Sequence, residues 1–183
     1  KYWGGHVFLN DVEMQYIVDN LFIGNKLSTA QLVTSDGVRI DLRNIRSPIV
    51  VFCSYGDNIT PPPQALGWIT DLYRNDLDVL GHDQTIVYAT HDSIGHLGIF
   101  VSGSVGRKEH QEFAANIDII DVLPAGIHHM QIDEHHDEAQ EHEPASDAYL
   151  TRIRRSNIDE IREIVRPDPE SDRRFAAAAR ISE

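Results

Sequence analysis

The sequence predicts an α/β fold in which helices flank a parallel sheet, and three neighbouring segments carry this prediction. Ile49 to Cys53 (IVVFC) and Thr85 to Ala89 (TIVYA) are continuous apolar, β-branched runs, a pattern typical of strands covered on both faces. Between them, Gln64 to Tyr73 (QALGWITDLY) repeats apolar residues at helical intervals. A strand, a helix and a strand at this spacing predict a βαβ unit.

Further helices are expected on both sides of this unit. Residues 10–22 begin with a capping residue and space their apolar side chains at helical intervals. A polar helix is expected at about residues 105–116. The run Ser156 to Asp159 has the form of a capping box, and it predicts a short helix that ends at Val165, before two prolines.

We divide the chain into three segments. Residues 1–127 contain a cap segment, both strands and the loops that follow them. Residues 128–149 are acidic, rich in histidine and without Lys or Arg, so they are predicted to form a solvated loop. Residues 150–183 are predicted to form a helical tail. The sequence lacks an initial Met and stops within a predicted helix, so we expect both ends to be truncated.

Composition excludes several classes of function. Twenty-nine acidic residues against sixteen basic ones give a net charge of −13, which disfavours binding to nucleic acid. No apolar run is long enough to predict a membrane span or a signal peptide. The single cysteine, Cys53, excludes an internal disulfide and favours a cytoplasmic protein.

Two residues at strand ends suggest catalysis. Asp57 follows the first strand, and His96 follows the second strand 39 residues later. Functional groups of open α/β sheets collect at the carboxyl ends of the strands, so we expect these two side chains to meet. An aspartate that accepts a hydrogen bond from a histidine forms two members of a nucleophile–histidine–acid triad. The chain order, acid before histidine, is that of the α/β-hydrolase fold.

The nucleophile of such a triad is expected outside this chain. An α/β-hydrolase nucleophile precedes the acid, in a glycine-flanked turn between a strand and a helix, and no such Ser or Cys precedes Asp57. Cys53 lies within the first strand and is interpreted as a core residue. The run Ser102 to Gly106 (SGSVG) follows His96 and is interpreted as a turn into a helix. The chain is therefore predicted to be the C-terminal part of an α/β-hydrolase domain.

Longer strings around Asp57 and His96 resemble a known family. Ile49 to Ile69 (IVVFCSYGDNITPPPQALGWI) and Ser93 to Ser102 (SIGHLGIFVS) are similar to polyhydroxyalkanoate synthases and their bacterial synthase-like relatives, as is Tyr16 to Ser28. The resemblance implies a cysteine nucleophile and 3-hydroxyacyl thioesters of coenzyme A as substrates. It places Asp57 and His96 at the acid and base positions. The elbow cysteine and the oxyanion-hole amides have no counterpart in this chain.

Simpler roles compete with catalysis at these positions. Asp57 is also placed to form an Asx turn before the prolines, and His96 to pack as an ordinary loop histidine. His91 and Asp92 precede His96 in the same loop, but they lack the adjoining Gly95, which we expect to let backbone approach closely.

The acidic segment contains residue types that can bind a divalent metal ion. The candidate ligands are histidines and acids of the acidic segment, His128, His129, Asp133, Glu134, His135, His136, Glu138 and His142. They match no defined ligand pattern. We therefore expect neither a metal nor a cofactor, and a metal-binding regulator is the third-ranked function.

The leading hypothesis is part of an acyltransferase or hydrolase that acts on 3-hydroxyacyl thioesters or esters. Its expected partner is this small-molecule substrate, and self-association into a homo-oligomer is left open. The alternative is a non-catalytic hydrolase-like scaffold or partner-binding module. A full-length sequence without a glycine-flanked Ser or Cys would favour this alternative.

Overall fold

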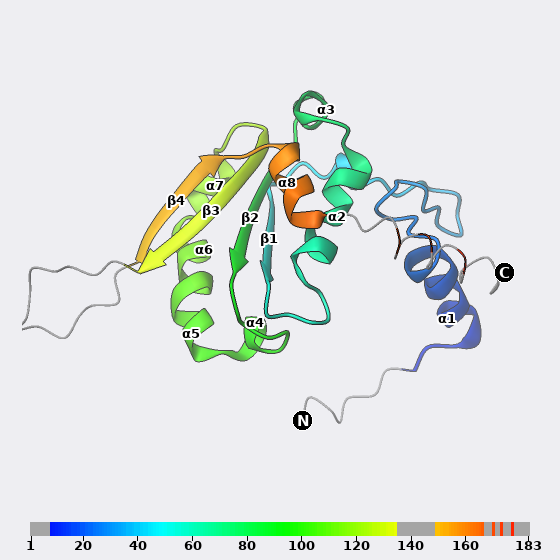
Figure 1. Cartoon of the computed structure of the whole chain (residues 1–183). Coiled ribbons are helices and arrows are strands. Elements are labelled where there is room, and N and C mark those ends of the chain that lie inside the picture. The colour runs from blue at the N-terminus through cyan, green and yellow to red at the C-terminus, as the bar shows by residue number, and fades with distance from the viewer. Residues whose placement is uncertain (1–7, 135–148, 167–169, 171–172, 174–176, 178–183) are drawn as a thin grey trace, which may run out of the picture. The chain divides into compact units, whose positions relative to one another are not determined.

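A computed structural model describes residues 8–134, 149–166, 170, 173 and 177 (Figure 1). The chain forms two compact units, residues 1–42 with 168–183, and residues 43–167. In the described part of the chain, no helix has both the length and the apolar character needed to cross a membrane.

The first unit contains the helical segment predicted for residues 10–22. Helix α1 (Asp11–Ile17) continues into a π-helical turn, η2 (Val18–Phe22). A reciprocal capping box begins α1, because Asn10 accepts from the Glu13 amide at 2.8 Å and Glu13 accepts from the Asn10 amide at 2.9 Å. A short 3-10 turn, η3 (Leu42–Asn44), joins the first unit to the second in sequence.

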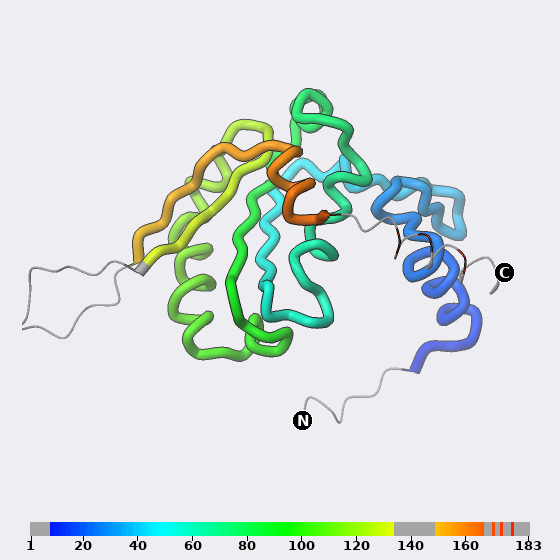
Figure 2. Tube along the Cα trace, in the orientation of Figure 1, coloured from blue at the N-terminus to red at the C-terminus, as the bar shows by residue number. Residues whose placement is uncertain are grey.

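The second unit is built on a four-stranded mixed sheet with helices on both faces, so the predicted α/β class is confirmed. The strands lie in the order β1 (Ile49–Ser54), β2 (Thr85–His91), β3 (Gly126–Glu134) and β4 (Tyr149–Arg155). β1, β2 and β3 are parallel, and β4 pairs antiparallel with β3. Figure 2 shows the chain path from β1 to β2 and on to β3.

The helices follow the strands as the βαβ pattern requires. Helices α2 (Pro62–Leu72) and α3 (Asp76–Gly81) connect β1 to β2. Between β2 and β3 lie α4 (Gly98–Val101), α5 (Gly103–Val105), the π-helical turn η4 (Gly106–His110), α6 (Gln111–Ala115) and α7 (Ile117–Asp121). Helix α8 (Ile158–Val165) follows β4, and Asn157 caps it by accepting from the Glu160 amide at 2.9 Å.

The sheet buries apolar side chains on both faces. On one face Val87, Ala89 and Met130 pack against Ile120 of α7, and Phe52 meets Phe113 of α6 edge to face, with 5.6 Å between ring centroids. Alternation along the strands places other side chains on the opposite face. Those side chains include Tyr88, whose hydroxyl lies 3.1 Å from the Ser156 hydroxyl beside α8. Figure 1 shows α2 and α8 on this side.

Two boundaries predicted from the sequence are wrong. Residues 128–134 belong to strand β3, not to a loop, and residues 150–155 form strand β4, not the start of a helical tail. The reason is a two-residue alternation, in which Met130 and Ile132 face the core while Gln131 and Asp133 are exposed. Residues 135–148 of the predicted loop lie outside the described residues.

Candidate active site

The loops that follow β1 and β2 meet at the carboxyl edge of the sheet. The Tyr55 amide donates to the His91 carbonyl at 2.8 Å, which extends the pairing of the two strands into the loops. A Cβ atom at Gly56 would lie 2.2 Å from the Ser93 carbonyl oxygen. Glycine is therefore the residue that permits this close approach of two backbones.

The contact between the loops joins the two residues predicted as acid and base. Asp57 Oδ2 lies 2.9 Å from His96 Nδ1. The Asp57 side chain is fully buried, whereas 30% of the His96 side chain is exposed. The pair therefore consists of a shielded carboxylate and an imidazole that solvent can reach.

Three further donors hold the Asp57 carboxylate. The amides of Ile59 and Thr60 donate to Oδ1 at 2.8 and 2.9 Å, and the Thr60 hydroxyl donates to Oδ2 at 2.7 Å. The same hydroxyl lies 3.3 Å from His96 Nδ1. Asp57 thus forms an Asx turn with one oxygen and contacts the histidine with the other, so the two interactions coexist in one side chain.

These hydrogen bonds determine the charge of the acid. Burial by itself raises the pKa of Asp57, but hydrogen bonds from Thr60, His96 and Ile59 outweigh burial and hold the pKa well below its usual range. An ionised carboxylate can only accept, so His96 Nδ1 carries the shared proton. In the neutral ring, Nε2 is then the basic nitrogen.

The expectation that Gly95 lets backbone approach closely is wrong. A Cβ atom at Gly95 would meet open space, so close backbone approach depends on Gly56 instead. His91 stabilises the loop that follows β2. Its Nδ1 accepts from the amides of Ser93 and Ile94 at 3.1 and 3.2 Å, which orders the loop.

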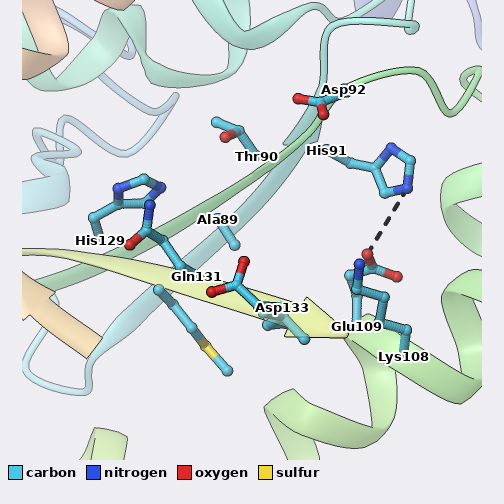
Figure 3. A pocket seen from close by; sticks show the side chains of 11 residues that line it. Ala89, Thr90, His91, Asp92, Lys108, Glu109, His129, Gln131 and Asp133 are labelled. Atoms are coloured by element: carbon cyan, nitrogen blue, oxygen red, sulfur yellow. Dashed lines mark ion pairs between the residues drawn. The ribbon is translucent and has the colours of Figure 1, made fainter. Parts of the chain in front are cut away.

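The other nitrogen of the His91 ring faces Glu109, a residue that no sequence pattern singles out. His91 Nε2 lies 3.8 Å from Glu109 Oε1, in the turn η4 (Figure 3). Glu109 lies within a predicted polar helix, where a glutamate is usually solvated. No local signal in the sequence distinguishes it from its exposed neighbours.

Cys53 is a core residue, as expected. It is 1% exposed in β1, and its Sγ lies 3.7 Å from the Ala89 carbonyl oxygen. Burial raises the pKa of the Cys53 thiol to about 11, so the nucleophilic thiolate is scarce at neutral pH. The predicted turn at Ser102 to Gly106 is mostly helical instead: Ser102 is an extended residue between α4 and α5, and Gly103–Val105 form α5. Among the described residues, no Ser or Cys side chain donates to His96 Nε2.

The candidate metal ligands within the described ranges are dispersed. His128 is buried and its Nε2 lies 2.9 Å from the Pro124 carbonyl oxygen. His129 projects from the opposite face of β3 and stacks on Tyr88, with 4.6 Å between ring centroids. No described group of three potential ligands could hold a metal ion. His135, His136, Glu138 and His142 lie outside the described residues.

Comparisons with known proteins give a family and one curated relative. The chain is 56% identical over 183 residues to "Uncharacterized protein in ackA 5'region" of Rhizobium meliloti, a match that covers all of this chain and 25% of that protein. The chain thus spans about a quarter of the length of this relative. No solved structure matches the chain. The model of the family described as "Protein of unknown function (DUF3141)" matches residues 1–183, and the chain belongs to this family.

Proposed function

We propose that this chain supplies the acid and the general base of a covalent acyl-transfer site. The observation that carries the proposal is the 2.9 Å contact between His96 Nδ1 and the buried carboxylate of Asp57. A carboxylate that accepts from Nδ1 fixes the tautomer of a catalytic histidine and stabilises the imidazolium that forms during the reaction.

In the proposed reaction, His96 Nε2 removes a proton from a Ser or Cys nucleophile as that nucleophile attacks an acyl carbonyl carbon. The imidazolium that forms faces the Asp57 carboxylate, which remains ionised because its pKa lies below the usual range. His96 then returns the proton to the leaving alcohol or thiol. The nucleophile belongs to a part of the protein beyond the residues described here.

The proposed substrates are 3-hydroxyacyl thioesters or esters, as the resemblance to polyhydroxyalkanoate synthases implies. The surroundings of the pair support an acyl group. Exposed apolar side chains lie beside His96 in sequence, namely Leu97, Phe100 and Val101, and beside Asp57, namely Tyr55 and Ile59. The Phe100 ring stands edge-on to the His96 ring, with 6.2 Å between centroids.

The full-length gene product provides the test, assayed with p-nitrophenyl butyrate and with 3-hydroxybutyryl-coenzyme A. Replacing His96 by Ala should lower kcat/KM by about 10²- to 10⁴-fold, because the general base is lost. The exposed His110 of η4 provides a matched control, and His110→Ala should retain wild-type turnover. Full activity in His96→Ala would reject the proposal.

A non-catalytic role is the competing outcome. It would be indicated by a full-length protein that turns over neither substrate and that no active-site-directed fluorophosphonate or iodoacetamide probe labels. Labelling that depends on His96, in a folded protein, would instead support an activated nucleophile.

A further inference from the structure

A second polar cleft lies at the same edge of the sheet, between β2 and β3 (Figure 3). The two strands pair only as far as Tyr88 opposite His129. Beyond that point β2 stays beside β1 and β3 stays beside β4, so the strands part. Their opening has a volume of about 440 Å³, which is within the range of small-molecule sites. Open α/β sheets bind ligands in crevices at the carboxyl ends of their strands.

One wall of the cleft presents a hydrogen-bond donor of fixed direction. Because His91 Nδ1 accepts from two backbone amides, the proton of the neutral ring is assigned to Nε2. That N–H group faces the cleft, and Figure 3 shows it directed toward Glu109. The loop geometry thus prevents the ring from presenting an acceptor there.

The facing wall presents the Glu109 carboxylate, which accepts no hydrogen bond from a side chain in the described part of the chain. The Glu109 side chain is 7% exposed and lines the cleft. His91 Nε2 lies 3.8 Å from Glu109 Oε1, a distance too long for a direct hydrogen bond. Among the described residues, no side-chain nitrogen or oxygen is both fully buried and without a hydrogen bond, so the Glu109 carboxylate opens toward the cleft. A hydroxyl group between the two side chains would satisfy both, because it accepts from one and donates to the other.

The remaining lining also mixes donors with acceptors. Three carboxylates and one ammonium group surround the opening, which disfavours an anionic ligand. The ammonium group of Lys108 lies over the Tyr149 ring, 5.9 Å from its centroid. The polar groups that line the cleft, besides the His91–Glu109 pair, are Thr90, Asp92, Lys108, His129, Gln131 and Asp133.

We propose that this cleft binds a neutral, hydroxyl-rich small molecule such as a monosaccharide or an inositol. One ligand hydroxyl bridges His91 Nε2 and Glu109, and others meet the polar groups of β3. In Figure 3, Gln131 and Asp133 lie between β3 and β2, where such hydroxyls would be placed. This inference does not depend on the proposed acyl transfer, since neither Asp57 nor His96 lines the cleft.

Binding to the full-length gene product tests the inference. We would titrate glucose, mannose and myo-inositol separately, and follow binding by calorimetry and by saturation-transfer NMR. At least one of them should bind saturably. Glu109→Gln should weaken that binding about 10-fold or more, because a hydrogen bond to a charged group is lost. Asp133→Asn tests the same cleft at an exposed strand position, so it decides the question if Glu109→Gln does not fold.

Asp118→Asn is the matched control, because it removes one negative charge from the exposed surface of α7, outside the cleft. It should bind as the wild type does. The inference is overturned if none of the three polyols binds, or if their binding is unchanged in the folded cleft variants. It is also overturned if inorganic phosphate, spermidine or Mg²⁺ binds in their place and the cleft variants weaken that binding. Because the readout is binding, the result is separate from the esterase assay.

Discussion

Asp57 shows how a single residue can serve the turn and the proposed chemistry together. Its Oδ1 accepts two backbone amides of the loop, and its Oδ2 faces Thr60 and His96. The sequence allowed the pair to be predicted, because both residues follow apolar strands that had to be parallel. The contact of the Thr60 hydroxyl with both Asp57 and His96 could not be predicted. A threonine near prolines commonly stabilises only the turn.

The depressed pKa of Asp57 predicts a particular dependence of stability on pH. A carboxylate whose pKa is lower in the folded state than in the unfolded state stabilises the fold above the unfolded value, about 3.9. That contribution is lost as the pH falls through this value toward the folded pKa. Urea unfolding of the 183-residue chain should therefore show wild type losing more stability than Asp57→Asn between pH 6 and about pH 3.

Asp118→Asn serves as the control for this titration, because Asp118 is exposed on α7. Its acid sensitivity should match that of the wild type. If Asp57→Asn lost stability in acid as steeply as the wild type, the hydrogen bonds around the carboxylate would not favour its ionised form.

At the scale of elements, the site depends on how closely two loops approach. Because a Cβ at Gly56 would meet backbone rather than a flexible side chain, Gly56→Ala must push the loops apart. We expect it to destabilise the chain by about 1–3 kcal/mol, as overpacking does. It should also lower kcat/KM in the full-length protein, because His96 would move away from Asp57. Thermal unfolding and the esterase assay measure the two effects.

Gly67 offers a matched comparison within helix α2. A Cβ there would meet nothing within 4 Å, and alanine favours a helix interior over glycine by about 0.5–1 kcal/mol. Gly67→Ala should therefore stabilise the chain slightly. Equal effects of the two substitutions would mean that Gly56 is not constrained by the opposite loop.

The elements that sequence reasoning identified are those with one dominant pattern. β1 and β2 are apolar runs, and α2 and α8 have helical spacing with a suitable beginning. β3 and β4 were missed because their exposed faces carry histidines, acids and arginines, so composition suggested a solvated segment. β3 and β4 pair antiparallel, and such a pair needs apolar residues on one face only, which Met130, Ile132 and Ile153 provide.

At the scale of the whole molecule, the cleft between β2 and β3 was beyond sequence reasoning. It exists because β3 diverges from β2 beyond His129 while it stays paired with β4 along its other edge. Glu109 reaches the cleft from a turn 18 residues after His91 in sequence. Tertiary packing alone brings such groups together, whereas Asp57 and His96 meet by the general rule for parallel strands.

The packing of both sheet faces makes residues 43–167 a single unit, and its cooperativity can be measured. Ile120 of α7 and Ile161 of α8 are 1% and 0% exposed, and α7 and α8 cover opposite faces of the sheet (Figure 1). Replacing either isoleucine by Ala should lower the free energy of unfolding by about 2–5 kcal/mol, through lost apolar contact and a remaining cavity. Ile117→Ala, at a half-exposed position of α7, should cost much less.

If the two faces of the sheet unfold together, the two buried substitutions will each destabilise one cooperative folding unit. The unfolding midpoints from far-UV circular dichroism and tryptophan fluorescence should then coincide in every variant. The effects of Ile120→Ala and Ile161→Ala should also add in the double variant, within about 0.5 kcal/mol, because the two helices lie on opposite faces of the sheet. Separate transitions for the two faces would instead mean that α8 folds onto the sheet independently, so that the cleft and the Asp57–His96 pair would not depend on it.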